Sequence, residues 1–351
     1  MTNITETITK LSLAMSISGH ERRIFDTIKD IAADSYDEIH EDKVGNITLI
    51  RRGKCRSGKD NAPCIMLDAH LDEIGMIVTQ IKDGGFLKVL NIGGIDTRIL
   101  PASIVTVYGK EEPFPAVVVS TPPHLQKPGE SSKLPKISDI MLDTGMSKEY
   151  LEKYAPIGTP VGFEPTVTVL KNNLLAGKGF DDKACAAVLL HAAASIDKPE
   201  DFDVCVTLTT REEVSGVGAK CAAYNLNPTA VIVTDVNFGR TPDVDKQKSL
   251  EVGKGAGVSI SAVTHKKLTR SIINYAKETE KQCQTIVEIK STGTNADGMP
   301  YIREGLAAAV MSLPLKNMHT PTEIISTDDA KSMSDLIAGF ISDRKRWDFT
   351  M

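Results

Sequence analysis

The segment CIMLDAHLDEIG, residues 64–75, begins as an apolar run and ends with side chains that can do chemistry. A strand buried on both faces of a parallel sheet has such a nearly continuous apolar run. The run stops at His70, and Asp72 follows two positions later. Side chains at positions i and i+2 of an extended chain point to the same side, so Asp72 could orient the His70 ring for a metal ion. Taken alone, the pair also fits an ordinary strand-end histidine beside a solvated aspartate.

Similar strands alternate with helices along the second half of the chain. Apolar runs predict strands at residues 204–209, 230–233 and 306–311, in addition to a short strand at 46–50. Periodic or alanine-rich segments predict helices at 183–195, 219–224 and 268–281, and a last helix from about Thr327. This alternation predicts an α/β fold with a mostly parallel sheet sandwiched by helices.

The sequence pattern changes between about Gly75 and Pro165. Short β-type runs (MIVTQI, FLKVLNI, SIVTVYG and AVVVS) are separated by glycine and proline turns, with one short helix expected near 147–154. Closely spaced strands with turn signals are typical of a small barrel or sandwich. We therefore expect residues 75–165 to form an inserted β-barrel-like domain, and residues 1–74 and 166–351 to form the two parts of the catalytic domain.

The composition of the chain limits which partners and which cellular compartment we expect for it. The formal net charge is -5 and there is no long basic run, which argues against a nucleic acid partner. No segment approaches the ~20 apolar residues that span a bilayer, and the polar, acidic N-terminus lacks the features of a signal peptide. Six scattered cysteines without a C-x-x-C pair fit small buried thiols. We expect a cytoplasmic protein.

Ser18 and Glu21 have the S-x-x-E spacing of a capping box, and the periodic segment IFDTIKDIAADS follows them. In a capping box the two side chains satisfy free backbone N–H groups in the first turn of a helix. The spacing therefore predicts that these two residues begin an amphipathic helix.

Other polar side chains also follow predicted strands, where ligands bind in open α/β sheets. Glu212 and Glu213 follow one strand, and Asp235 ends another. Asp181-Asp182 precede a helix, and His319 lies in a loop restrained by proline. Each has an ordinary alternative: a helix cap and first-turn acid for the aspartate pair, a solvated turn for the glutamates, a turn residue for Asp235, and a surface position for His319.

Taken together, these motifs resemble the M42 family of metallo-aminopeptidases, which includes the tetrahedral TET peptidases, over nearly the whole chain. The matching motifs are AHLDEIG (69–75), GKGFDDK (177–183), REEVSGVGA (211–219), TDVNFGRTPDV (234–244) and LPLKNMHTPTE (313–323). Weaker matches are STPPHL (120–125) and GTNADG (293–298). Lys183 stands where the family usually has arginine, and Ser215 where it often has glycine.

The resemblance implies a dinuclear metal centre. His70, Asp181 and Asp235 would bind one ion, and the second would be bound by Asp181, Glu213 and His319. Glu212 would be the general base for a metal-activated water, Asp72 would orient His70, and the peptide bond after Asp181 would be cis. Nitrogen and oxygen ligands without thiolate fit Zn²⁺, Co²⁺ or Mn²⁺, with Zn²⁺ and Co²⁺ preferred.

The implied activity is removal of N-terminal residues from short peptides. The implied assembly is a homo-oligomer paired through the inserted domain: at least a dimer, and a dodecamer if it follows the TET members. Rival readings are a dinuclear-metal deacylase, an endoglucanase-labelled hydrolase on the same fold and a non-catalytic assembly protein. A chelator distinguishes the deacylase from the endoglucanase. It would stop the metal-dependent deacylase, whereas glycoside hydrolysis needs paired carboxylates and no metal. The sequence contains no G-x-S-x-G motif, which argues against a serine hydrolase.

Overall fold

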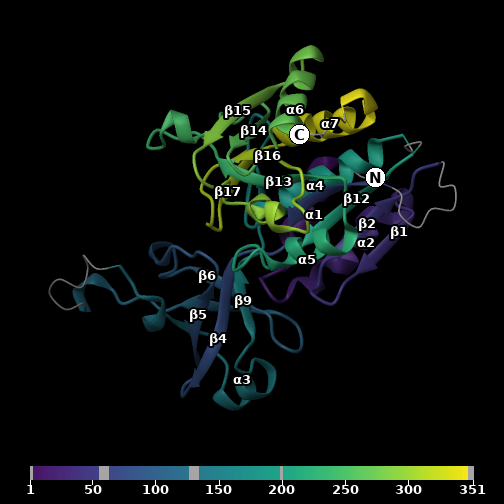
Figure 1. Cartoon of the computed structure of the whole chain (residues 1–351). Helices are drawn as coiled ribbons and strands as arrows, with labels where there is room; N and C mark the ends of the chain where they lie inside the picture. The colour runs from purple at the N-terminus through teal and green to yellow at the C-terminus, as the bar shows by residue number, and fades with distance from the viewer. Residues whose placement is uncertain (1–2, 55–62, 126–133, 198–200, 347–351) are drawn as a thin grey trace.

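The computed structural model describes residues 3–54, 63–125, 134–197 and 201–346 (Figure 1). An α/β part contains both ends of the described chain, and a separate barrel lies beyond one end of its large sheet (Figure 1). We call residues 75–163 the barrel and the remaining described residues the α/β part. Among the described residues, no helix is long and apolar enough to cross a membrane.

The large sheet has eight strands in the order β1-β2-β12-β3-β13-β16-β14-β15. Strands β12, β3, β13 and β16 run parallel at its centre, whereas β2 and β14 join them antiparallel. The strands are β1 (Glu38–Glu41), β2 (Ile47–Arg51), β12 (Asp203–Thr209), β3 (Cys64–His70), β13 (Ala230–Phe238), β16 (Ala308–Leu315), β14 (Ala256–Ser261) and β15 (Cys283–Glu288). The predicted fold class, with its mostly parallel sheet, is confirmed.

Helices cover both faces of this sheet. They are α1 (Ile4–Leu13), α2 (Phe25–Ala32), α4 (Phe180–Ser195), α5 (Val217–Leu226), α6 (Lys266–Glu278) and α7 (Thr327–Ser342). On β3, Ile65 and Leu67 pack into the large core that contains α4, whereas Met66 packs on the other face with Ala219 and Ala223 of α5. Alternate side chains of one strand thus enter two different cores, which explains why β3 is apolar throughout.

The barrel closes in the strand order β4-β5-β8-β7-β6-β9 and has its own apolar core. Its strands are β4 (Gly75–Lys82), β5 (Phe86–Ile92), β6 (Ile104–Val107), β7 (Phe114–Val118), β8 (Met141–Asp143) and β9 (Pro160–Phe163). The predicted short helix is α3 (Lys148–Tyr154), and the side chain of Ser147 caps it by accepting the N–H of Tyr150. Because β4 begins five residues after His70, the barrel lies at the end of the sheet where β3 stops.

A second, three-stranded sheet was not predicted from the sequence. It contains β10 (Val167–Val169), β11 (Leu174–Gly177) and β17 (Glu323–Ser326), all antiparallel. Strand β11 leads directly to the Asp181 segment, and β17 follows the His319 loop. The pairing of Gly177 with Glu323 therefore fixes two motifs, distant in sequence, beside each other.

The predicted capping box at Ser18 and Glu21 is wrong. A short 3-10 turn (Glu21–Ile24) precedes α2, and no side chain caps either element. The hydroxyl of Ser18 instead donates to Asp72, and the carboxylate of Glu21 accepts from the backbone of Arg211. Both side chains thus form hydrogen bonds with residues far along the chain instead of capping the helix.

The five described cysteines are free thiols. Cys64, Cys185 and Cys205 are buried, and Cys221 and Cys283 are half-buried. Cys55 lies outside the described residues, as do residues 126–133 in the connection between β7 and β8.

Candidate metal centre

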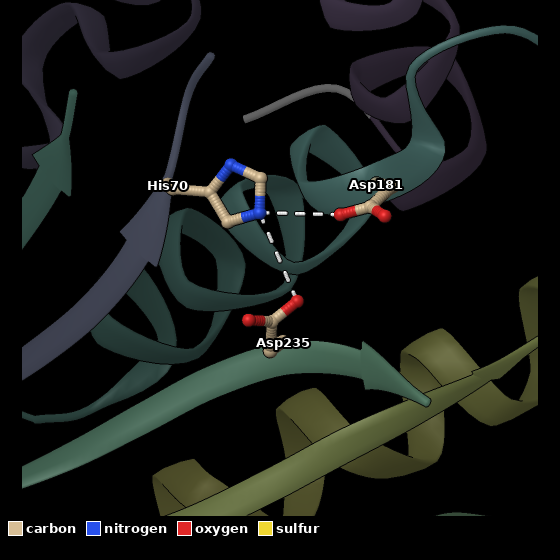
Figure 2. Close-up of side chains that lie close together, drawn as sticks. All are labelled: His70, Asp181 and Asp235. Carbon is tan, nitrogen blue, oxygen red and sulfur yellow. Dashed lines mark hydrogen bonds and ion pairs between the residues drawn. The ribbon is translucent and has the colours of Figure 1, made fainter. Parts of the chain in front are cut away.

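The parallel strands at the centre of the sheet end at one edge and bring their polar residues to a common level. His70 is the last residue of β3 and pairs with Thr209, the last residue of β12. Asp68 pairs with Val233, which places Asp235 of β13 beside His70. The Nε2 atom of His70 lies 3.8 Å from Asp235 Oδ1. Figure 2 shows both side chains pointing from neighbouring strands into the same space.

Asp181 lies between two groups of possible ligands. Its Oδ1 atom is 3.1 Å from His70 Nε2, and its Oδ2 atom is 3.3 Å from His319 Nε2 (Figure 2 shows the first of these contacts). His319 Nε2 also lies 3.3 Å from Glu213 Oε1. The peptide bond between Asp181 and Asp182 is cis, as the family resemblance led us to expect.

Asp72 fixes the loop that follows β12. Its Oδ1 atom accepts the N–H of Glu212 at 2.9 Å, and its Oδ2 atom accepts the N–H of Glu213 at 3.1 Å. The His70 Nδ1 atom is 2.9 Å from the backbone carbonyl of Asp72 but 3.6 Å from the Asp72 carboxylate. A carbonyl oxygen only accepts, so Nδ1 carries a proton, and Nε2 is the nitrogen that can bind a metal once it has lost its own proton.

Glu323 connects the two loops that present Asp181 and His319. One carboxylate oxygen accepts the N–H of His319 at 3.0 Å, and the other accepts the N–H groups of Phe180 and Asp181 at 2.7 and 3.2 Å. His319 itself has a positive φ of 61°, a conformation that costs energy in a residue with a β-carbon. The buried Glu323 carboxylate helps to stabilise it.

The two histidines are held in a strongly acidic environment. Burial lowers the tendency of His70 to charge, but the hydrogen bond to Asp181 and the nearby Asp72 carboxylate raise its pKa well above the usual value. Hydrogen bonds to Asp181 and then Glu213 raise the pKa of His319 to about 11. Burial opposes ionisation of Asp181, yet the two histidines hold its pKa well below its usual range.

The other carboxyl groups are shifted in the opposite direction. Burial, reinforced by the charges of Glu213 and Asp181, raises the pKa of Glu212 to about 7 against the attraction of His70. Burial also raises the pKa of Glu213, and burial together with the Asp182 charge raises that of Asp235 well above its usual value. A cation placed among these groups would remove much of this repulsion.

The donor set fits two divalent cations. The candidate groups are His70, Asp181 and Asp235 on one side and Asp181, Glu213 and His319 on the other, with ligand atoms in each group within 4.8 Å of one another. Imidazole and carboxylate donors without thiolate suit Zn²⁺, Co²⁺ or Mn²⁺. The four carboxylates of Asp181, Asp235, Glu212 and Glu213 would balance two such ions in charge. The structure brings all five predicted ligands together, and their binding of metal stays a prediction.

Sequence reasoning missed a buried ion cluster beside this centre. Glu73 lies 2.7 Å from the Nζ of Lys178 and 3.1 Å from that of Lys183, and all three side chains are buried. Lys183 also donates to the carbonyl of Ala14. The lysine that replaces the family's arginine thus faces Glu73 and the N-terminal segment. The sequence did contain adjacent clues, since Glu73 follows Asp72 and both lysines flank Asp181.

The remaining histidines lie outside the centre. Those with side-chain interactions in the structure are His191, which bonds to Thr7, His40, which pairs with Glu38, and His265, which caps α6. His20 precedes the turn before α2 and His124 lies in the loop after β7. None of the five belongs to either candidate ligand group.

Comparison with known proteins places this arrangement in one family. The model of the M42 glutamyl aminopeptidase family matches residues 46–336. The chain is 31% identical to the lysyl aminopeptidase of Pyrococcus furiosus, over 98% of this chain and 99% of the relative.

Solved structures agree with this match. The TET aminopeptidase from the marine sediment archaeon Thaumarchaeota archaeon SCGC AB-539-E09 has a TM-score of 0.91 at 26% identity, covering 99% of each chain. The Pyrococcus horikoshii TET1 peptidase, which can assemble into a tetrahedron or a large octahedral shell, has a TM-score of 0.84 at 25% identity. That match covers 97% of this chain and 100% of the other.

Proposed function

Since the chain belongs to the M42 glutamyl aminopeptidase family, a family of peptide hydrolases, we propose that it removes N-terminal residues from short peptides at a dinuclear metal centre. One ion would be held by His70, Asp181 and Asp235, and the second by Asp181, Glu213 and His319. The observation that carries this proposal is the position of Asp181, whose two carboxylate oxygens face two different histidines. A carboxylate in that position can serve both ions at once.

Zn²⁺ or Co²⁺ at these positions would act as Lewis acids, polarising the scissile carbonyl and lowering the pKa of water. The chain's own residues supply the remaining functions. Asp72 holds the backbone of the 212–213 turn, and the Asp72 carbonyl sets the proton position on the His70 ring. Glu323 holds the Asp181 and His319 loops.

Glu212 is the proposed general base. A base works best when its pKa lies near the working pH, and burial raises the pKa of Glu212 to about 7. Its carboxylate would accept a proton from the attacking water and return it to the amine of the leaving peptide. Glu213 has the adjacent position but faces His319, which suits a ligand better than a base.

The assembly proposed for this chain is a homo-oligomer in which residues 75–165 pair subunits. The exposed apolar side chains of Ile104 and Val117 support it, because they pair across β6 and β7 on the outside of the barrel. A hollow dodecamer of the TET type would restrict access to short or unfolded peptides. The free thiols of the described cysteines support the expected cytoplasmic compartment.

A peptide panel tests the function directly. Release of free N-terminal amino acids should require Zn²⁺ or Co²⁺, stop on chelation and return when metal is restored. N-acylated amino acids and cellulose serve as competing substrates in the same assay. Faster hydrolysis of the acylated substrates would replace the aminopeptidase by a deacylase, and chelator-resistant cellulose hydrolysis would favour a glycosidase.

A further inference from the structure

The turn that presents Glu212 and Glu213 is held by side chains rather than by a strand partner. Four successive backbone N–H groups, from Thr210 to Glu213, each donate to a side-chain oxygen. In chain order the acceptors are Asn46 Oδ1 at 3.1 Å, Glu21 Oε1 at 3.1 Å, Asp72 Oδ1 at 2.9 Å and Asp72 Oδ2 at 3.1 Å. Three separate parts of the chain therefore converge on one turn of four residues.

Arg211 is the residue of this turn that most needs support. Its φ is 60°, in the left-handed region, where a residue with a β-carbon is strained unless its surroundings hold it. The Arg211 N–H donates to Glu21, and Glu212 follows immediately. The Arg211 carbonyl accepts the N–H groups of Ser215 and Gly216, so Glu21 supplies the support on the N–H side of this strained residue.

Glu21 is a carboxylate buried beside this turn. Only 4% of its surface is exposed, and burial raises its pKa. A buried carboxylate costs free energy unless hydrogen bonds compensate it. Backbone hydrogen bonds from Gly19, Glu21 and Arg211 supply that compensation, and the bond from Arg211 is the one that reaches the turn.

Ser18, three residues earlier, supports the same turn through Asp72. Its hydroxyl donates to Asp72 Oδ2 at 2.6 Å, the oxygen that also accepts the Glu213 N–H. Gly19 lies between the two residues with a φ of 86°, a conformation that favours glycine. Residues 18–21 thus reach the turn at two points, directly through Glu21 and indirectly through Ser18.

We propose that Ser18 and Glu21 are positioning residues that hold the 210–213 turn so that Glu212 and Glu213 keep their geometry in the metal centre. The assignment rests on the proposed function for its catalytic consequence. Neither side chain contacts a candidate ligand atom directly. Small displacements of catalytic groups are costly, since a misplacement of about 1 Å can lower a rate roughly 10²-fold.

The test compares Glu21→Ala, Glu21→Gln and Ser18→Ala with the control Asp203→Ala. Asp203 is 3% exposed and accepts the backbone N–H of Gly53 at 2.9 Å, but at the opposite end of β12. It also pairs with Arg52 at 2.5 Å, so it is a buried carboxylate whose hydrogen bonds and ion pair lie away from the turn. Three quantities are measured on the full chain: deuterium exchange of the peptide that contains residues 210–213, affinity for Co²⁺, and kcat and KM with a short peptide.

Glu21→Ala should speed exchange in the turn and lower kcat by roughly ten- to a hundredfold, with KM changed much less. Glu21→Gln should recover most of both losses, because its amide oxygen can still accept the Arg211 N–H. Ser18→Ala should show the same pattern more weakly, with reduced Co²⁺ affinity through Glu213. Asp203→Ala should leave exchange in the turn and kcat near their original values.

Unchanged exchange and kcat in Glu21→Ala would overturn the proposal, as would equal losses in Glu21→Ala and Asp203→Ala. If Glu21→Ala fails to fold, Glu21→Gln and Ser18→Ala decide the question by the same exchange measurement. A wild-type chain without metal-dependent peptidase activity would refute the proposed function instead. In that case exchange confined to the turn would still show whether residues 18–21 hold it.

Discussion

The barrel and the end of the large sheet where His70 and Asp235 lie, which we call the strand-end edge, bury opposite kinds of side chain. The barrel core consists of apolar side chains, and the buried polar groups described in the barrel are the hydroxyls of Tyr108, Thr144 and Thr159. The strand-end edge buries charged groups in a small volume. They include His70, Asp72, Glu73, Lys178, Asp181, Asp182, Lys183, Asp235 and Glu323.

Burying charges is expensive, and a buried ion pair is often no more stabilising than an apolar pair of the same size. The barrel shows that this chain can build a closed core without charges. The charged edge is therefore better explained by chemistry than by stability. Its groups should be sensitive to changes that leave the shape of the fold intact, whereas the barrel should be sensitive mainly through its shape and surface.

The largest effect should come from the Glu73 cluster. Glu73→Gln keeps the side-chain shape but leaves Lys178 and Lys183 without their carboxylate, which should destabilise the fold by about 3–5 kcal/mol. The barrel counterpart, Thr144→Val, removes a buried hydroxyl that donates to the Gly85 carbonyl and accepts the Met146 N–H, and it should cost about 1–3 kcal/mol. Urea unfolding measures both. Equal losses of unfolding free energy in the two variants would mean that the buried charges need their partners no more than the buried hydroxyl of the barrel does.

The next effect separates the two adjacent glutamates. Glu212→Gln should lower kcat at least ~10²-fold while metal binding stays intact, because the base is lost but no ligand is. Glu213→Gln should weaken metal binding through the site that it shares with His319. Turnover measured at saturating metal, with metal content determined on the same samples, distinguishes them. Near-normal turnover in Glu212→Gln with loss in Glu213→Gln would show that the roles are reversed or wrong.

Metal affinity should rise with pH, by up to about tenfold per unit for each proton displaced. A histidine must be neutral to bind a metal, and in the metal-free protein Asp181 and Glu213 raise the pKa of His319 to about 11. Below that pKa a proton occupies His319 and competes with the ion, so affinity falls as pH falls. Co²⁺ titrations at three pH values between 6.5 and 8 measure the slope. A pH-independent affinity would exclude the protonated histidines as ligands.

The smallest effect on catalysis should come from the barrel surface. Val117 pairs with Ile104 across β7 and β6, and their exposed fractions are 48% and 49%. Val117→Asp should lower the mass of the assembly, whereas hydrolysis of a short substrate per chain should stay nearly unchanged. Val169→Asp is the control, since Val169 is 75% exposed on β10 in the α/β part. Light scattering measures the masses, and a wild-type mass near one 38.0 kDa chain would contradict the assembly proposal.

Local patterns predicted the α/β alternation well because its signals are local. The apolar run before His70 formed the expected strand, and the short helix expected near 147–154 formed as α3. Helix α1 was missed, although Asn3 accepts the Glu6 N–H and caps it. Strand β15 at the sheet edge and its neighbour β14 were also not predicted. The three-stranded sheet was missed because β11 pairs with β17, far along the chain.

The candidate site shows the same limit. Its ligands could be named only because several strand-end motifs matched one family together, since each motif alone fits an ordinary structural role. The supports could not be found that way. Ser18 and Glu21 have the spacing of a helix cap, and only the folded chain shows that Asp72 and Arg211 compete for them. The cluster of Glu73 with Lys178 was hidden for the same reason, because the two residues lie far apart in sequence.

The central claim is that Asp181 is shared between two metal ions. Anomalous X-ray diffraction from crystals grown with Co²⁺ or Zn²⁺ tests it most directly. We expect two anomalous peaks about 3.5–4 Å apart, one between His70 and Asp235 and one between Glu213 and His319, with Asp181 bound to both. For zinc, ligand distances should be about 2.0–2.2 Å. A single peak, or two peaks of which one does not contact Asp181, would contradict the claim.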